Sequence, residues 1–408
     1  DEDFFQVKTL GIYAQQEFGW RDRIFVGGSI RGDNTSTFGT NLGFQYFPSA
    51  NLSWVVSEES FLEGVDFLST LRVRTAWGQS GLRPGFRDAV TLFAPTTVAI
   101  DGGDVPGVAL SVTGNDELKQ ETTTEWEIGF DAGFFSNRLS AEFTYFDRSS
   151  ADALISRNLP GSLGLTTSVF QNLGSIKNSG TELSLRLDVV QTETFGMNIG
   201  FNNTQISNEI SELGEGIEDI IFNRGQQRHA EGYTAGGFWQ APVTWNDADG
   251  NGQLDLSEVN VADESVFIGP AIPTWQRSLF ADFRLFDFIT ISTLVEGRGG
   301  HYSATDSEAF RCGRRTTRGC AAVGDPEASL QEQAAYIADR FGGATGNNSS
   351  YGYIQSADFW RWRELSVTFD MPRAISNSVA ALEGLRITVA GRNLGLLTDF
   401  GGLDPETV

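Results

Sequence analysis

The chain has 408 residues, a formal net charge of −24 and 20% charged residues. This acidic balance makes nucleic acids and anionic lipid surfaces poor partners, because both are negatively charged. The mean hydropathy is −0.20 and no run of about 18 apolar residues occurs, so membrane-spanning helices are excluded. A membrane β-barrel is not excluded, because its strands are only half apolar. On composition alone, a large soluble all-β protein is the alternative.

Apolar and polar residues alternate along many short segments, most clearly from Trp126 to Phe134. Successive side chains of a strand point to opposite faces, so each such segment has one apolar and one polar face. The 47 glycines and 12% aromatic residues suit the turns and aromatic girdles of a barrel. The pattern predicts twelve strands, near residues 6–18, 23–33, 43–56, 71–81, 122–135, 138–148, 176–190, 196–208, 275–285, 288–299, 354–370 and 385–395.

The connections between these strands fall into two alternating sets. One set is short or compact: 19–22, 57–70, 136–137, 191–195, 286–287 and 372–384. The other set is mostly long: 34–42, 82–121, 149–175, 209–274, 300–353 and the stretch after 395. Short turns on the periplasmic side and long loops on the extracellular side are typical of outer-membrane barrels. The sequence therefore predicts an all-β fold, an antiparallel transmembrane β-barrel.

Three local features depart from simple alternation. In the strand near 354–370, Trp360 and Trp362 fall on one face while Leu365 falls on the other, which predicts a β-bulge near Glu364. In the first of the longer compact connections, Ser57, Glu58 and Glu59 are expected to cap a helical turn that carries Phe61 and Leu62. In the last compact connection, Pro372 is expected to open a short helix over 374–381.

Several longer phrases resemble the barrel of SusC/RagA-type TonB-dependent outer-membrane receptors. They are FPSANLSWVVSEESFL (47–62), LRVRTAWGQSG (71–81), LKQETTTEWEIGFDAGFFSNRLSAEFTYFDR (118–148), NLGSIKNSGTELSL (172–185), FWRWRELSVTFDMP (359–372) and LRITVAGRNLGLLTDFGGLDPE (385–406). These phrases cover most of the chain and occur in the order found in that family. The resemblance implies TonB-dependent import of oligosaccharides or peptides across the bacterial outer membrane, in contact with its lipid.

The same resemblance implies partners and a larger protein. Such receptors work with a SusD-like surface lipoprotein and draw energy through TonB. They have an N-terminal plug and a barrel of about 22 strands. The resemblance therefore predicts that residues 1–408 are the C-terminal portion of a barrel, strands ten to twenty-one, with the plug, the early strands, the terminal strand and the TonB-contacting segment absent. A half-barrel would leave unpaired edges in lipid, which supports this interpretation.

Two other functions remain open from the sequence. One is a passive outer-membrane pore or structural barrel without energy coupling. The other is a soluble β-rich adhesin or lectin. No serine-hydrolase elbow, zinc-protease motif or P-loop occurs, so we expect no enzymatic activity. His229 is interpreted as a surface residue rather than a catalytic base.

One long connection contains a match to a calcium-binding EF-hand loop. Oxygen ligands occur at the spacing that such a loop requires, with Gly252 at the sharp turn. The predicted ligands are Asp247, Asp249, Asn251, Gln253 (through its backbone carbonyl), Asp255 and Glu258. The flanks at 236–245 and 261–269 are expected to be extended and loop-like, so this would be an isolated loop that Ca²⁺ stiffens. The alternative is an acidic surface turn without metal.

Aromatic residues and a cysteine pair mark the same long connections. Exposed aromatic rings stack on sugar faces or peptide side chains, or belong to the aromatic girdle of a barrel. The candidate ligand-binding residues are Phe238, Trp239, Trp245 and Tyr302, with Tyr351 and Tyr353 nearby. Cys312 and Cys320 are expected to form a local disulfide in an oxidising compartment. That disulfide would hold the three arginines between 313 and 319 on one external loop.

Overall fold

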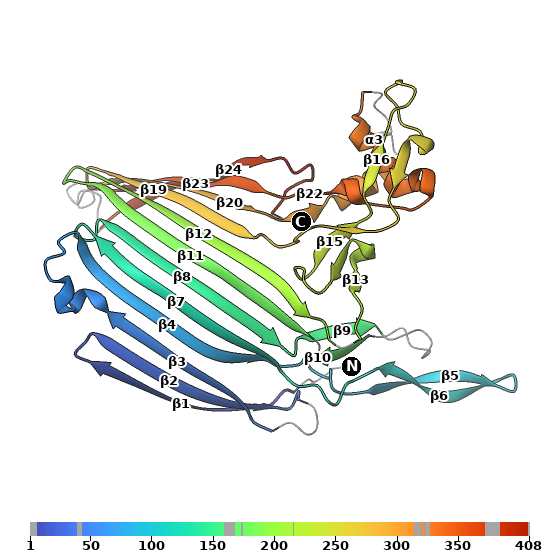
Figure 1. The fold of residues 1–408 in the computed structure, drawn as a ribbon, viewed down its shortest axis with the longest axis horizontal. Coiled ribbons are helices and arrows are strands. Elements are labelled where there is room, and N and C mark those ends of the chain that lie inside the picture. Colours follow the sequence, from blue (N-terminus) through green and yellow to red (C-terminus); the bar gives the residue numbers. More distant parts are fainter. Residues whose placement is uncertain are drawn as a thin grey trace. The chain divides into compact units, whose positions relative to one another are not determined.

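The structure, a computed structural model, describes residues 6–38, 43–158, 168–172, 174–214, 216–313, 320, 322, 327–371 and 384–406. Two units can be distinguished by their internal contacts. The first comprises residues 1–132, 144–180 and 208–220, and the second comprises residues 133–143, 181–207 and 221–408. The secondary structure is mainly β (Figure 1).

The principal element is a twelve-stranded sheet in which neighbours follow chain order. Its strands are β1 (Thr9–Trp20), β2 (Ile24–Thr35), β3 (Gln45–Val55), β4 (Leu68–Leu82), β7 (Glu121–Phe134), β8 (Leu139–Ala151), β11 (Ser175–Gln191), β12 (Phe195–Glu212), β19 (Trp275–Leu285), β20 (Ile289–Gly299), β23 (Phe359–Asp370) and β24 (Arg386–Thr398). The ladders from β1 to β4 and from β12 to β24 are antiparallel. All twelve predicted strands are thereby confirmed. The predicted strand near 354–370 is divided, because Ile354–Ser356 (β22) pairs elsewhere.

The predicted bulge is present in β23. Trp362 pairs with Val295 of β20 and Glu364 pairs with Leu294, so Arg363 is the extra residue. The register towards β24 shifts at the same place. The side chain of Arg363 is directed to carboxylates, with its Nε 2.6 Å from Oε2 of Glu296 and its Nη1 2.7 Å from Oε2 of Glu406. The extra residue thus explains why the alternation of side chains before Arg363 and the alternation after it are out of step.

Of the two connections expected to contain helical turns, the structure describes the one that begins near residue 57. Short 3₁₀ turns form at Val56–Glu58 and Ser60–Leu62, so the predicted turn over Phe61 and Leu62 is confirmed, but no side chain caps either turn by a hydrogen bond. Glu59 holds this connection instead, accepting a hydrogen bond from Nε1 of Trp54 at 3.1 Å and pairing with Arg23 at 3.5 Å. The helix predicted after Pro372 lies outside the described residues.

Within the second unit, the alternation separates an apolar face from a polar face. Side chains from five consecutive strands, β8, β11, β12, β19 and β20, line one apolar surface, and they include Leu139, Leu185, Leu187, Ile199, Phe201, Leu279, Ala281 and Val295. Polar side chains of β11, β12, β19 and β20 line a separate hollow, among them Asp188, Asn198, Asp282, Arg284 and Thr290. β11, β12, β19 and β20 therefore each contribute to both faces, as a period of two requires.

In the first unit, the polar face carries an ion-pair network. Nε of Arg72 on β4 lies 2.8 Å from Oδ2 of Asp131 on β7. Arg74 reaches Oδ1 of the same carboxylate at 3.3 Å and donates to the hydroxyl of Thr144 on β8 at 2.7 Å. These arginines alternate with apolar residues along β4, so their charges all lie on one face.

The connections contain more regular structure than the sequence predicted. Residues 82–121 include a separate hairpin of β5 (Leu92–Ile100) and β6 (Gly103–Val112), and β9 (Leu154–Asn158) pairs with β10 (Ser168–Asn172) (Figure 1). Short strands follow β12 in the chain: β13 (Ile220–Phe222), β14 (Gln227–His229), β15 (Gly237–Gln240), β16 (Val243–Trp245), β17 (Val259–Val261) and β18 (Val266–Gly269). The expectation that 261–269 is loop-like was therefore wrong, because Val266–Gly269 joins the sheet of β13, β14 and β15.

Helices occur among the described residues of the connection between β20 and β23, where only loop was expected. They are α1 (Asp306–Gly313) and α3 (Leu330–Phe341), flanked by β21 (Tyr302–Ala304), which pairs with β22. Ser329 and Glu332 form a capping box at the start of α3, and Gly342 ends it with φ of +74°. Among the described residues, no helix has the length and apolar character needed to cross a bilayer.

The two long connections share one hydrophobic core. We call the described residues of 221–269 and 301–356 the loop module. Its core joins β16, β17 and α3 through Val243, Leu254, Val259, Val261, Ala334, Ile337 and Ala338. Val259, Ala334 and Ala338 are completely buried. Burial of these side chains gives the loop module a core of its own.

Candidate functional site

The predicted calcium loop brings three of its carboxylates together. One oxygen from each of Asp247, Asp249 and Glu258 lies within 4.8 Å of the others. The chain reverses through Gly250 and Gly252, whose φ angles of +69° and +77° favour glycine. A cluster of hard oxygen donors of this kind is suited to Ca²⁺ rather than to a transition metal.

Hydrogen bonds within the loop orient these oxygens. Asp247 accepts from the backbone N–H of Asn251 at 3.1 Å and of Gly252 at 2.9 Å. Glu258 accepts from the backbone N–H of Ala248 at 2.8 Å and of Asp255 at 3.1 Å, so it already bridges the two ends of the loop.

Two further predicted ligands, Asn251 and Asp255, have partners within the loop. Asn251 accepts from the N–H of Gln253 at 2.6 Å and donates to Asp249 at 2.7 Å. The carboxylate of Asp255 accepts from the backbone N–H of Ser257 at 2.7 Å and from its hydroxyl at 2.6 Å. These two bonds lower the pKa of Asp255. Asp255 therefore serves here as the cap of the 3₁₀ turn Leu256–Glu258.

Gln333 of α3 attaches the calcium loop to the loop module. Its side-chain carbonyl accepts from the N–H of Leu254 at 2.8 Å, and its amide donates to the carbonyls of Gly252 at 3.0 Å and Ala328 at 2.9 Å. Gln333 is 7% exposed. One buried side chain therefore satisfies three backbone groups, two of them in the calcium loop.

The aromatic candidates do not form one exposed platform. Phe238 and Trp239 are only 5% and 9% exposed, so the expectation that they offer free ring faces was wrong. Both lie on β15, which has strands on both sides, and Trp239 packs on Tyr233 at 4.6 Å and Phe267 at 5.4 Å between ring centroids. Tyr353 is buried as well. Neighbouring aromatic rings therefore cover the ring of Trp239.

The two other aromatic candidates are more open. The ring of Trp245 is 40% exposed at the edge of the calcium loop. Tyr302 is partly buried against Gly269, where a Cβ atom would lie 2.3 Å from the ring. His229, expected at the surface, is partly buried and accepts from the N–H of Gly236 at 3.1 Å. This burial lowers the pKa of His229.

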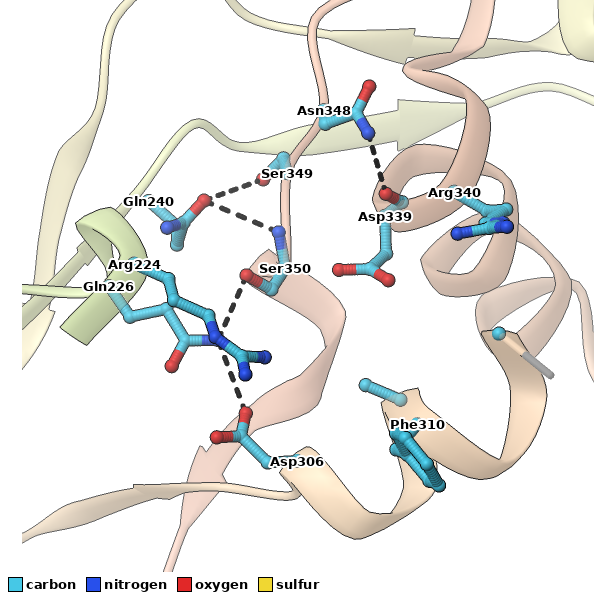
Figure 2. A pocket seen from close by; sticks show the side chains of 12 residues that line it. Arg224, Gln226, Gln240, Asp306, Phe310, Asp339, Arg340, Asn348, Ser349 and Ser350 are labelled. Atoms are coloured by element: carbon cyan, nitrogen blue, oxygen red, sulfur yellow. Dashed lines mark hydrogen bonds between the residues drawn. The ribbon is translucent and has the colours of Figure 1, made fainter.

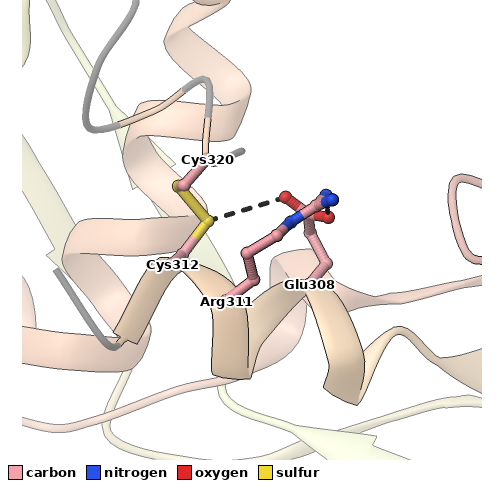
Figure 3. Close-up of a disulfide and its surroundings, with 4 residues drawn as sticks. All are labelled: Glu308, Arg311, Cys312 and Cys320. Carbon is pink, nitrogen blue, oxygen red and sulfur yellow. Dashed lines mark hydrogen bonds and ion pairs between the residues drawn. A yellow bond between two sulfur atoms is a disulfide. The ribbon is translucent and has the colours of Figure 1, made fainter. Parts of the chain in front are cut away.

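Cys312 and Cys320 are joined by a disulfide, and both sulfur-bearing side chains are buried (Figure 3). Glu308, one helical turn before Cys312, pairs with Arg311. The bond fixes the end of α1. The three arginines between the cysteines lie outside the described residues.

A polar cavity that the sequence did not predict lies elsewhere in the loop module. It has a volume of about 550 Å³ (Figure 2). The residues that line it are Arg224, Gln226, Gln240, Asp306, Ala309, Phe310, Gly313, Asp339, Arg340, Asn348, Ser349 and Ser350. They come from segments that are far apart in the sequence. Gln226 and Ser350, for example, are separated by 124 positions and are joined by a hydrogen bond of 3.1 Å. No local motif joins such segments, so no sequence signal could have revealed the cavity.

Comparison with known families identifies the architecture. Residues 2–394 match the family model described as "TonB dependent receptor-like, beta-barrel". The chain belongs to this TonB-dependent receptor family. Receptors of this family are outer-membrane proteins, so the apolar face of the sheet is the face suited to lipid and the polar face is the face suited to water.

Individual relatives agree with this assignment. TonB-dependent receptor P3 of Formosa agariphila is 25% identical over 98% of the chain, which covers 42% of that receptor. TonB-dependent receptor SusC of Bacteroides thetaiotaomicron is 24% identical over 97% of the chain, which covers 41% of SusC. The structure of the RagAB peptide transporter has a TM-score of 0.82 at 22% identity, with 98% of the chain and 45% of the RagAB chain covered. The chain thus spans less than half the length of these relatives.

The contacts of Gln333 lead to a prediction about the stability of the loop module. Gln333→Ala removes three hydrogen bonds and leaves buried backbone groups unpaired, each of which costs about 1–3 kcal/mol. We expect the amide of Leu254 to exchange with solvent at least about tenfold faster, as measured by hydrogen–deuterium exchange of the complete receptor. Gln331→Ala on the exposed face of α3 is the control. Equal protection of Leu254 in both variants would contradict this role.

Proposed function

We propose that this chain supplies barrel wall and external loops of a TonB-dependent importer that carries oligosaccharides or peptides across the outer membrane. The family match over residues 2–394 carries the proposal. Similarity to SusC and to the RagAB peptide transporter supports this substrate range. The polar face of the sheet supports passage of hydrophilic molecules, because its charged side chains need water.

The partners are part of the same proposal. A SusD-like surface lipoprotein would deliver the substrate at the external side, and TonB would supply the energy for import. The similarity to the TonB-dependent receptor SusC and to the RagAB peptide transporter supports both assignments. We also propose that the chain has a binding role and no catalytic one, since the relatives named above are receptors and transporters.

Import can be tested by deleting the complete receptor gene. We expect the deletion strain to lose uptake of one substrate class, either oligosaccharides or peptides, and to regain it when the gene is restored. Growth on each class as sole carbon or nitrogen source gives the measurement. Unchanged growth on both classes would contradict the proposal. Uptake that persists without TonB would instead indicate a passive pore.

We further propose that the calcium loop binds Ca²⁺ and that the ion stiffens the external side of the receptor. Support comes from the oxygen-only donor set and from the three carboxylates already within 4.8 Å of one another. Like charges at this distance repel, and a divalent cation would remove that repulsion. Gln333 would transmit the stiffening to α3, since it bonds both to the loop and to its own helix start.

Calcium binding can be tested in the complete receptor with one conservative variant. Glu258→Gln keeps the size of the side chain but removes the charge at the twelfth loop position. We expect Ca²⁺ to bind at least about tenfold more weakly, measured by isothermal titration, because a bidentate carboxylate is lost. Glu264→Gln, an exposed acidic residue outside the loop, is the matched control. Equal calcium affinity in the two variants would refute the site.

A further inference from the structure

The polar cavity is built so that several of its polar groups are fixed in place. Two buried glutamines, Gln226 at 6% and Gln240 at 9% exposure, form one side of it. The amide of Gln226 donates to Oδ1 of Asp306 at 3.3 Å and to the hydroxyl of Ser350 at 3.1 Å (Figure 2). Gln240 accepts from the backbone N–H of Ser350 at 3.3 Å. A site whose groups are held before binding loses little entropy when a ligand arrives.

The charges around the cavity balance. Arg224 and Arg340 contribute two positive charges, and Asp306 and Asp339 contribute two negative ones. Among the described residues, no ion pair links these arginines to these aspartates. The cavity therefore offers hydrogen-bond donors and acceptors with no excess of either charge, and it favours a ligand that has no net charge and many hydrogen-bonding groups.

The backbone that carries Arg224 is held in an unusual conformation. Asn223 and Arg224 have φ angles of +48° and +57°, and Gly225 follows at +85°. Residues other than glycine rarely adopt this region, and such strain occurs preferentially at ligand sites. The backbone carbonyl of Gly225 accepts from the amide of Gln240 at 3.3 Å, which ties the turn to the cavity.

One apolar surface complements the polar groups. Phe310 of α1 borders the cavity and is 62% exposed, although it lies next to buried Cys312 on the same helix (Figure 2). The disulfide fixes the end of this helix. An aromatic ring beside planar amide, carboxylate and guanidinium groups matches a sugar ring, which has an apolar face and a rim of hydroxyls.

The same features argue against a peptide. Recognition of peptides that differ in sequence relies on main-chain hydrogen bonds, most often along a free strand edge. The cavity is lined mostly by side chains of helices and irregular segments. Its one residue from a strand, Gln240, ends β15, which has β14 and β18 on its two sides, and the backbone N–H of Ser350 is already bonded to Gln240. A volume of about 550 Å³ lies within the range of small-molecule sites, but the lining is polar where most such sites are apolar.

We propose that the polar cavity binds one end of a neutral oligosaccharide at the external side of the receptor. Phe310 stacks on the apolar face of a sugar ring. Asp339, Asp306 and Arg224 bond to its hydroxyls. The inference rests on the proposed import function and deepens it, because it selects oligosaccharides over peptides as the captured class.

The test uses the complete receptor, purified in detergent, and titration with maltohexaose, xylohexaose and mannohexaose. A tryptic digest of casein represents peptides. We expect at least one hexasaccharide to bind, and Phe310→Ala and Asp339→Asn each to weaken that binding by about fivefold to tenfold. The matched controls are Ile272→Ala, an exposed apolar residue that does not line the cavity, and Glu264→Gln. Both controls should bind as the parent does.

Each other outcome overturns the inference. Binding of none of the three hexasaccharides, or equal affinity in the cavity variants and the controls, removes the cavity as a sugar site. Casein peptides that bind, and lose affinity with Phe310→Ala, assign the cavity to peptides instead. A variant counts as folded when it keeps the disulfide between Cys312 and Cys320 and still shows heat-modifiable migration on gels. If cavity variants bind normally while deletion of the receptor abolishes uptake, the import proposal stands and only the cavity inference fails.

Discussion

In a bilayer, each backbone N–H and C=O must find its hydrogen-bond partner within the protein, because lipid offers none. The twelve-stranded sheet meets this constraint through ladders between strands that follow one another in the chain. Along each paired strand, successive side chains point to opposite faces of the sheet. Leu187 and Leu279 therefore lie on the apolar surface, and Asp188 and Asp282 lie in the polar hollow. Even the bulge at Arg363 obeys the rule, since it shifts the register without ending the ladder.

Where the chain leaves the sheet, the constraint changes. The loop module has water around it and needs a core of its own, and it obtains one by packing β16 and β17 against α3. Gln333 then joins this core to the calcium loop by three hydrogen bonds. The same helix continues to Asp339 and Arg340, which border the polar cavity. One short helix therefore links the core, the candidate metal loop and the candidate ligand site.

The strands could be predicted because their signal is local and repeated. Alternation over about ten residues locates β7, and the change of phase between Trp362 and Leu365 locates the bulge. The capping box of Ser329 and Glu332, followed by Leu330, Ala334, Ile337 and Ala338 at helical spacing, would also have revealed α3. By contrast, the burial of Phe238 and Trp239 and the existence of the cavity depend on contacts between distant segments. No repeating pattern in a single sequence indicates contacts of this kind.

In the proposed orientation of the barrel, the short connections between strands face the periplasm and the long connections face outward. Both cysteines of this chain are in a disulfide, so a cysteine introduced into it can be labelled with a membrane-impermeant maleimide and compared with the unsubstituted complete receptor under the same treatment. Glu264→Cys tests a long connection and Ser136→Cys tests the turn between β7 and β8. We expect the maleimide to label Glu264→Cys on intact cells, and to label Ser136→Cys only after the outer membrane is permeabilised. Labelling of Ser136→Cys on intact cells, or protection of Glu264→Cys, would contradict this orientation.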